Sequence, residues 1–513
     1  MPLATYHLPL MSLLTLLIFG GTAVLYTTLL PAKWREWALL AASIIVLYWL
    51  QPFNPIRFSG YILPTLTIGL VVMGWWVTQN QPPGGSEPPG GLAQRLKKED
   101  RTTLFVIAGL VLAISFLRFL PQELRPIANR PPSPVWVTAG LVGLGTAVTL
   151  VARFGKSRQN DLANRSTKIA ILLIIGLFAI LKTEVLATAV AHLWRNLTNQ
   201  DTSLASAADL TWLGFSYVAF RLLHTLRDRQ TGQLPAMTLR EYATYVLFFP
   251  AITAGPIDRA ERFVTDLRAL SQMVGLDAAR FADGLTRIGI GLFKKFVIAD
   301  SLALGMSLDG VDVTLVQSPG RLWLLLYGYA FRLFFDFSGY SDIAIGLGLL
   351  FGVRLPENFR RPYRQTSLTA FWQSWHITLS DWARFYVFTP LSRKLLRRKP
   401  RPSPTLIVLS AQLATMVTIG LWHGVGGNFL IWGLWHGAGL FIHKQWSDRT
   451  RKWYRGLAEK PAQKWAWTPA LSKVAVAVSW FLTFHYVVIG WVWFVLPDPA
   501  LAAQTILKLF GGG

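Results

Sequence analysis

The sequence GLWHGVGGNFLIWGLWHGAGL, residues 420 to 440, joins two apolar segments of the kind that decides this fold. It contains the tetrapeptide LWHG twice, which places His423 and His436 among apolar and aromatic residues. Runs of roughly 18 to 22 apolar residues, long enough to cross about 30 Å of hydrocarbon as a helix, recur along the whole chain. We therefore predict an all-α, polytopic integral membrane protein.

The composition agrees with a membrane protein. Of the 513 residues, 52% are hydrophobic and 15% are charged, and the mean hydropathy is +0.39. About a quarter of the residues in an ordinary soluble domain are charged, so a soluble protein is excluded. The first apolar run is expected to remain as a span, because it is too long for a signal peptide and no Lys or Arg precedes it. The candidate spans cover residues 9 to 30, 34 to 50, 59 to 77, 103 to 120, 134 to 152, 168 to 190, 209 to 224, 240 to 255, 281 to 306, 321 to 352, 371 to 391, 404 to 422, 427 to 443 and 474 to 496.

Positive charge is concentrated in alternate short loops between these spans. The net charge is +24 and the pI about 10.4. Residues 153 to 168 carry five Lys or Arg, whereas residues 191 to 208 carry one. Basic loops stay on the cytoplasmic side, which predicts an N-terminus outside the cytoplasm. Anionic membrane lipids, and not nucleic acid, are the expected partners of these loops.

Cysteine is absent from the sequence. Disulfides, Cys-based metal sites and an acyl-cysteine intermediate on this chain are therefore excluded. Any acyl transfer has to use other residues.

Low-complexity sequence is confined to short connectors. QPPGGSEPPGG, residues 81 to 91, and RPPSP, residues 130 to 134, are predicted loops. The doubled LWHG does not extend into a repeat of roughly 20 to 50 residues. A single integral membrane domain is expected over residues 1 to 513. Its parts are residues 1 to 200, with less typical spans, residues 209 to 445, the core, and residues 470 to 513, the last span and tail.

The aromatic segment FWQSWHITLSDW, residues 371 to 382, carries the first candidate histidine. On one helix, Trp372, Trp375 and Trp382 would lie within about 80° of one another, with His376 at the edge of the stripe. Ser380 is also in this segment. His376 is either a core residue that donates to a backbone carbonyl or a functional intramembrane histidine, and both interpretations stay open. Basic residues flank residues 371 to 391 at both ends, which predicts a re-entrant or interfacial segment beside a cavity.

The glycine-rich stretch GVGGN, residues 424 to 428, predicts a break between the two LWHG copies. On a continuous helix His423 and His436 would be about 20 Å apart and about 220° around the axis from one another, so they cannot share a metal ion, and no metal site is predicted. His436 is interpreted first as a histidine that is hydrogen-bonded between helices.

A polar island, YAFRLFFDFSGYSDIAIG, interrupts the apolar run over residues 329 to 346. Arg332 and Asp336 are four residues apart, and an ion pair between them is the favoured interpretation. The alternative is a direct role for this island in binding substrate.

Together these segments resemble the membrane-bound O-acyltransferase family, in its bacterial branch of alginate O-acetylation components and teichoic-acid D-alanyl transferases. The resemblance is carried by FFDFSGYSDIAIGLGLLFGVRLPENFRRPY (334 to 363), FWQSWHITLSDWARFYVFTPL (371 to 391) and GLWHGVGGNFLIWGLWHG (420 to 437). It implies a ring of about 11 to 14 transmembrane and re-entrant helices around a central cavity. By position, His423 matches the near-invariant histidine of the family, and His376 matches its second conserved polar position.

The resemblance also implies a reaction. An acetyl or other short acyl group would pass from a cytoplasmic thioester, foremost acetyl-CoA, to a hydroxyl outside the cytoplasm, in O-acetylation of a polysaccharide such as alginate or of the cell wall. A neutral His423 would act as the general base, and His376 would orient a reactant or stabilise the oxyanion. No permanently bound cofactor is expected. A separate extracytoplasmic acetyltransferase would be the partner, and the location would be the bacterial inner membrane. The substrate-channel candidates are Trp372, Trp375, Ser380, Trp422, Asn428, His436, Asp336 and Tyr340.

Two other functions remain as alternatives. A transporter or flippase of a lipid or glycan precursor would be permitted by Arg332, Asp336 and Asp342, although the internal repeat that many transporters have is not found. A haem-binding electron carrier would need axial histidines on facing helices. His224, His443 and His485 could be offered for it, but no matched pair is found.

Overall fold

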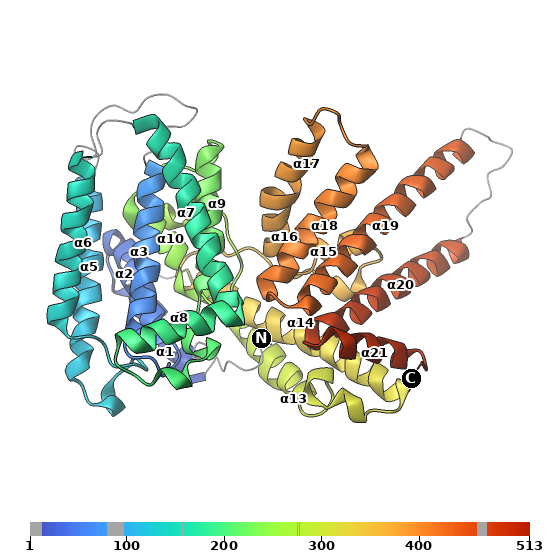
Figure 1. Cartoon of the computed structure of the whole chain (residues 1–513), viewed down its shortest axis with the longest axis horizontal. Coiled ribbons are helices and arrows are strands. Elements are labelled where there is room, and N and C mark those ends of the chain that lie inside the picture. The colour runs from blue at the N-terminus through green and yellow to red at the C-terminus, as the bar shows by residue number, and fades with distance from the viewer. Residues whose placement is uncertain are drawn as a thin grey trace. The chain divides into compact units, whose positions relative to one another are not determined.

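The computed structural model describes residues 13–79, 97–154, 159–273, 275, 277–458 and 469–512. All regular elements in these ranges are helices, as Figure 1 shows, which confirms the all-α prediction. The predicted loop at residues 81 to 91 lies outside the described residues.

The described residues form two compact units. We call residues 7–288 with 344–355 the N-terminal unit, and residues 289–343 with 356–513 the C-terminal unit. Helices α12 and α14 each continue from one unit into the other. The expectation of one domain over the whole chain stays a prediction.

The N-terminal unit is built around the short buried helix α10, which packs against α2, α3, α5 and α9. The start of α10 is fixed by a capping box, in which the Thr238 hydroxyl accepts from the amide of Glu241 and the Glu241 carboxylate accepts from the amide of Thr238. The helices of this unit are α1 (Leu13–Thr28), α2 (Ala32–Trp49), α3 (Ser59–Gln79), α5 (Lys98–Ser115), α6 (Pro134–Phe154), α7 (Gln159–Lys182), α8 (Glu184–Leu197), α9 (Phe215–Gln230), α10 (Leu239–Leu247), α11 (Ala260–Ala269) and the greater part of α12 (Ala278–Leu292), with 3₁₀ turns at Phe116–Phe119, Gln122–Leu124, Thr202–Leu204, Ala207–Leu210, Phe249–Ala251 and Leu270–Gln272.

Two predicted spans of this unit are not continuous helices. The span predicted over residues 168 to 190 breaks between α7 and α8, whose axes differ by 94°. The span predicted over residues 240 to 255 contains only α10, with nine residues, which is too short to cross a membrane. Helix α10 ends at Leu247 because Pro250, which lacks a backbone N–H, follows in the chain.

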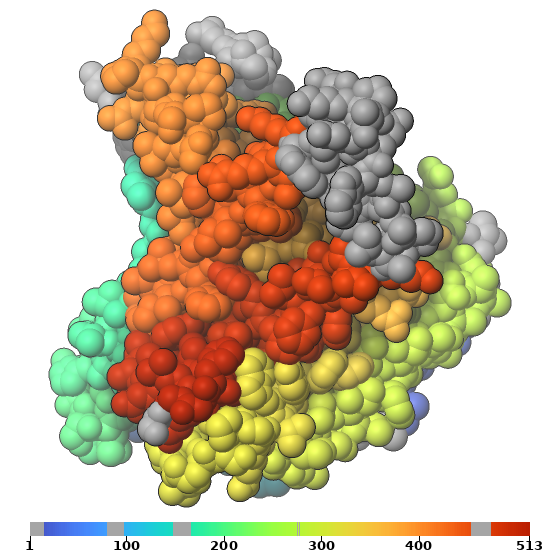
Figure 2. All heavy atoms as spheres, turned by 90° about the vertical axis from the view of Figure 1, so that its right-hand side faces the viewer, coloured from blue at the N-terminus to red at the C-terminus, as the bar shows by residue number. Residues whose placement is uncertain are grey.

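The C-terminal unit contains the segments that carry the candidate site. Helix α18 packs along α19, α19 packs against α20, and α15 contacts both α19 and α20. Figure 2 shows the surface of this unit hollowed between the orange α19 and the red α20. Its helices are α13 (Asp300–Ala303), α14 (Pro319–Leu350, through residue 343), α15 (Leu368–Trp372), α16 (Ile377–Ala383), α17 (Thr389–Leu396), α18 (Pro404–His423), α19 (Gly427–Ala458), α20 (Pro469–Val495) and α21 (Pro499–Leu509), with 3₁₀ turns at Leu308–Gly310, Val313–Leu315 and Pro362–Arg364 and π-helical turns at Phe293–Ala299 and Arg384–Phe388.

Several helices are suited to cross a membrane. Within the described residues, five helices are long and apolar enough, and a sixth span is obtained if the bent pair α7 and α8 counts as one. These helices confirm a multi-pass membrane protein. The ring of about 11 to 14 helices around a cavity stays a prediction.

Interruptions of the helix distinguish the C-terminal unit from a set of straight spans. The span predicted over residues 371 to 391 is divided into α15, α16, a π-helical turn and α17, and the one predicted over residues 281 to 306 is divided by another π-helical turn. Such turns insert an extra residue into a helix and occur frequently at functional sites.

Candidate functional site

His423 is the last residue of α18, at the turn into α19. The predicted break is confirmed, since α19 begins at Gly427. Gly424 allows the turn to close, because a Cβ atom there would lie 2.6 Å from the Phe429 ring. The His423 ring is half-buried, with ring centroids 4.7 Å from Phe494 and 5.8 Å from Trp432.

His376 lies between α15 and α16 in a left-handed backbone conformation, with φ 43° and ψ 54°. Such a conformation costs a non-glycine residue about 1–3 kcal/mol and persists only when its surroundings fix it. Two backbone hydrogen bonds fix it here: Ile377 donates to the carbonyl of Asn358 at 2.9 Å, and Arg360 donates to the carbonyl of Ser374 at 2.9 Å. The 371–382 segment is therefore not one helix, and the predicted single stripe of tryptophans is wrong.

Asn358 determines which nitrogen of His376 carries the proton. The amide nitrogen of Asn358 donates to Ser341 Oγ at 3.2 Å, and Asn358 Oδ1 accepts from Thr378 Oγ1 at 2.7 Å and lies 3.3 Å from His376 Nδ1. Since Oδ1 only accepts, Nδ1 of a neutral ring bears the proton, and Nε2 keeps a lone pair. The His376 side chain is buried, and its Nε2 has no hydrogen-bond partner among the described residues.

The two candidate catalytic histidines contact the same indole. The Trp422 ring lies 4.5 Å from the His423 ring and 6.2 Å from the His376 ring, centroid to centroid, in edge-to-face geometry. Further ring contacts join these residues to predicted ones and to Trp432 and Trp491, which were not predicted. We call the whole set the aromatic cluster: Trp372, Trp375, His376, Trp422, His423, Trp432, His436 and Trp491.

His436 occupies a cage of aromatic rings. Its centroid lies 4.9 Å from Trp432, 5.1 Å from Trp372 and 6.0 Å from Trp491, and a Cβ atom on Gly490 would lie 2.7 Å from its Nε2. The side chain is 1% exposed, and neither ring nitrogen has a hydrogen-bond partner among the described residues. The interpretation of His436 as hydrogen-bonded between helices is therefore wrong, because aromatic rings surround it where polar groups were expected.

The other predicted residues of the 371–382 segment lie in two different environments. Trp372 and Trp375 belong to the aromatic cluster, whereas Trp382 contacts Tyr386 in the following turn. Ser380 Oγ donates to the backbone carbonyl of Trp375 at 3.2 Å. The break at His376 redirects the chain, so one segment supplies residues to two environments.

The predicted ion pair between Arg332 and Asp336 is wrong. Arg332 pairs with Asp309, and Asp336 pairs with Lys295 at 2.6 Å. Both partners come from the segment before α14, which places opposite charges nearer to each residue than the neighbour four positions along the helix. Asp336 is therefore neutralised by a residue that the sequence pattern did not indicate.

The remaining candidates lie beside the cluster. Asn428 is buried at the start of α19, next to Phe429, whose ring stacks with that of His423 at 6.1 Å. Tyr340 is buried in α14, three residues beyond Phe337, whose ring meets that of His376 at 4.6 Å. The role of Asn428 and Tyr340 in a substrate channel stays a prediction.

Sequence reasoning missed three residues of the site. Trp432 and Trp491 hold His436, and Asn358 orients His376. Trp432 lies within the LWHG stretch and Asn358 within the motif PENF, so a signal was present for both. Trp491 lies on α20, and its contacts with the aromatic cluster arise only on folding.

Neither a metal nor a haem is indicated by these side chains. Within the described ranges, no group of three or more His, Cys, Asp or Glu lies close enough to hold a metal ion. The histidines offered for haem have side-chain partners of their own: His224 contacts the Tyr245 hydroxyl, and His485 Nε2 lies 2.8 Å from the Tyr327 hydroxyl.

Comparison of the sequence with known proteins shows which family the chain resembles. The model of the MBOAT, membrane-bound O-acyltransferase family matches residues 164–493. The chain is 35% identical over 271 residues to a peptidoglycan O-acetyltransferase of Helicobacter pylori, an alignment that covers 53% of this chain and 46% of the relative. It is also 35% identical over 302 residues to a probable alginate O-acetylase, AlgI, of Pseudomonas aeruginosa, covering 59% of this chain and 52% of that protein.

A third relative extends the comparison. The chain is 32% identical over 292 residues to a teichoic acid D-alanyltransferase of Streptococcus thermophilus, covering 56% of this chain and 68% of that protein. The chain spans about half the length of the peptidoglycan and alginate relatives. The family model covers more than half of the chain and includes both candidate histidines. The chain therefore belongs to the membrane-bound O-acyltransferase family.

Proposed function

We propose that this protein is an O-acyltransferase that moves an acetyl or other short acyl group from a thioester, foremost acetyl-CoA on the cytoplasmic side, to a hydroxyl outside the cytoplasm. Family membership and the activities for which the relatives are named support it. The observation that carries the proposal is the placement of His376 and His423 against one indole, that of Trp422.

His423 is proposed as the general base. A ring nitrogen of neutral His423 takes the proton of the acceptor hydroxyl, and the oxygen attacks the thioester carbonyl carbon. The tetrahedral intermediate then expels the thiolate as the C–S bond breaks, and the imidazolium of His423 returns the proton to sulfur. Since the chain has no cysteine, direct transfer or a transient acyl-histidine or acyl-serine are the routes that remain.

His376 is proposed to orient the acceptor and not to stabilise the oxyanion. A neutral ring that donates from Nδ1 to Asn358 offers only a lone pair at Nε2, which cannot donate to an oxyanion. A lone pair instead accepts from a hydroxyl. We assign to it a second hydroxyl of a polyhydroxylated acceptor, which fits a polysaccharide or cell-wall glycan. The buried indole N–H of Trp432, which has no acceptor among the described residues and whose ring contacts His423, is the proposed oxyanion donor.

The cellular setting follows from the same proposal. The protein would lie in the bacterial inner membrane with its N-terminus outside the cytoplasm. A separate extracytoplasmic acetyltransferase would be the partner protein on that side of the membrane. Acetyl-CoA or another acyl thioester would be a co-substrate, with no permanently bound cofactor.

The test is His423→Ala in membranes supplied with acetyl-CoA. We expect thiol release and base-labile ester formation to fall by about 10²–10⁴-fold, the usual contribution of a general base. His192→Ala, at an exposed residue of the N-terminal unit, is the matched control. Membrane insertion of both variants is checked by protease protection. Activity near wild type in H423A removes His423 from the mechanism.

The alternative function, transport of a lipid or glycan precursor, predicts a different result when surface glycans are measured. Arg332, Asp336 and Asp342 each already form an ion pair within the C-terminal unit. Mass spectrometry of surface glycans from cells with and without the protein tests it. Substrate that crosses the membrane without gaining an ester supports transport, whereas a loss of O-acyl groups in the deletion strain supports acyl transfer.

A further inference from the structure

Helix α8 departs from the direction of the span before it. Helix α7 ends at Lys182, and α8 follows after Thr183 at an angle of 94°. Figure 1 shows α8 running across the direction of α3 and α7. A helix that turns so sharply at the end of an apolar span leaves the membrane normal.

The two faces of α8 differ in chemistry. The inner face consists of Ala187, Ala191 and Arg195, all buried, and the two alanines pack in one core cluster with residues on neighbouring segments. The outer face carries exposed apolar residues, with exposed fractions of 75% for Val185 and 74% for Leu197, beside the exposed polar residues Glu184, His192 and Asn196. Four of its apolar side chains, Val185, Leu186, Leu193 and Leu197, are therefore exposed, whereas Val190 and Trp194 are partly buried against the core cluster.

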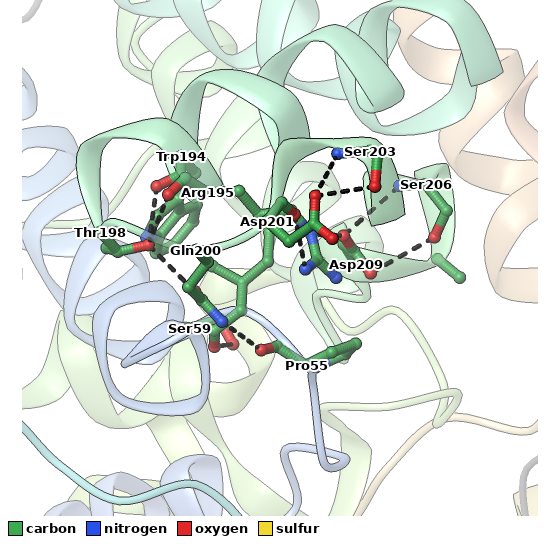
Figure 3. Close-up of polar contacts among 12 residues, drawn as sticks. Pro55, Ser59, Trp194, Arg195, Thr198, Gln200, Asp201, Ser203, Ser206 and Asp209 are labelled. Atoms are coloured by element: carbon green, nitrogen blue, oxygen red, sulfur yellow. Dashed lines mark hydrogen bonds and ion pairs between the residues drawn. The ribbon is translucent and has the colours of Figure 1, made fainter.

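A polar network beneath α8 fixes which face points outward (Figure 3). Arg195 Nε donates to Asp209 Oδ2 at 2.6 Å, and Arg195 Nη1 donates to the carbonyl of Asp201 at 3.3 Å. The hydroxyl of Ser206 also donates to Asp209, at 3.3 Å. Rotating α8 to bury its leucines would expose the alanines and separate this buried ion pair. We call Arg195, Asp201, Ser206 and Asp209 the α8 clamp.

Further hydrogen bonds join three loops of the N-terminal unit: the loop after α2, the loop before α6 and the loop after α8. Gln200 donates to the carbonyl of Pro55 at 2.9 Å, and Asn129 donates to the carbonyl of Asn54 at 2.6 Å. Trp136, close after the loop before α6, is 76% exposed. Exposed tryptophans gather at membrane–water interfaces, where their amphipathic rings are favoured.

We propose that α8 lies in the plane of the membrane interface, with its apolar outer face among lipid acyl chains. The partner is a lipid surface, and not a second protein, because the apolar exposure is continuous with the preceding span: Ile169 and Leu172 of α7 are 61% and 67% exposed. Helices with separate apolar and polar faces lie in the plane of the membrane interface, with the apolar face buried at the boundary of the acyl chains. By the distribution of basic loops, the leaflet is the one outside the cytoplasm.

The absence of cysteine makes this inference directly testable. A nitroxide on Leu193→Cys, whose side chain is 56% exposed, reports the surroundings of the outer face. The protein is placed in nanodiscs of phosphatidylcholine and phosphatidylglycerol, and collisions with oxygen and with a water-soluble nickel chelate are measured. We expect L193C to collide several-fold more with oxygen than with nickel.

Matched positions calibrate the result. Leu172→Cys on α7 is the lipid reference, and Ser271→Cys, exposed after α11, is the water reference. Nickel accessibility at L193C equal to that of S271C overturns the proposal in favour of water. Low collision with both reagents and an immobile spectrum overturn it in favour of a covering protein. Adding Asp209→Asn to L193C is expected to increase label mobility, and an unchanged spectrum removes the α8 clamp from the proposal.

Discussion

The aromatic cluster and the α8 clamp treat buried polar atoms in opposite ways. In the clamp, Arg195 and Asp209 are buried and bonded to one another. In the cluster, His376 Nε2 and both nitrogens of His436 are buried without a hydrogen-bond partner among the described residues. A buried polar atom left unpaired costs roughly 1–3 kcal/mol. The first arrangement leaves no buried charge without its partner, and a fold keeps the second where function requires polar atoms to be ready for a substrate.

The largest stability effect is expected in the clamp. Arg195→Ala leaves Asp209 buried without its partner, and breaking a buried pair in this way costs about 3–5 kcal/mol. Unfolding in detergent, followed by tryptophan fluorescence, measures the loss. The double variant R195M with D209L is the control, expected within about 1 kcal/mol of wild type because no charge remains buried. A single variant as stable as wild type would show that the pair is not desolvated.

The second-largest effect is expected on activity, and it tests whether the aromatic cluster takes part in catalysis. Asn358→Ala removes the Oδ1 atom that accepts from His376 Nδ1, and a catalytic ring that shifts by about 1 Å loses about 100-fold in rate. Thiol release from acetyl-CoA is the measurement. Asn358→Asp keeps an oxygen that accepts from Nδ1, so it is expected to recover much of the rate. Equal loss in both variants would argue that Asn358 only supports the fold.

A smaller effect tests how closely the cage surrounds His436. Gly490→Ala places a Cβ atom 2.7 Å from His436 Nε2, and overpacking of this kind costs about 1–3 kcal/mol. The unfolding free energy in detergent measures it. In combination with His436→Ala the clash with the imidazole disappears, so the two substitutions are expected to be non-additive. Strict additivity would contradict the contact.

The smallest expected effects are those of a substitution at His436, which tests whether this residue contributes to stability or to activity. His436→Phe removes two unpaired nitrogens while keeping a ring, so the unfolding free energy should stay within about 1 kcal/mol of wild type. If the cluster serves the substrate, activity should still fall by about 2- to 10-fold, the worth of one hydrogen bond. Unchanged activity with a raised unfolding midpoint would make His436 a packing residue.

The sequence was sufficient for whatever depends on local chemistry. Apolar runs determined that the chain is helical and crosses the membrane, because hydrocarbon requires every backbone group to be bonded within its own segment. The helix α14 and the spans α18 and α20 were predicted for that reason, with ends that differ by a few residues from those observed. The break after His423 was predicted from the glycines of GVGGN, residues 424 to 428.

Only the tertiary structure decided which side chains form ion pairs and hydrogen bonds with one another. Arg332 pairs with Asp309 and not with Asp336, and the ring of His376 is turned by Asn358, because groups distant in sequence came nearer than those one helical turn away. The 94° bend into α8 was also invisible to an apolar pattern that continues through it. Periodicity reports which side chains share a face of one helix, and it carries no information about which other segment will lie against that face.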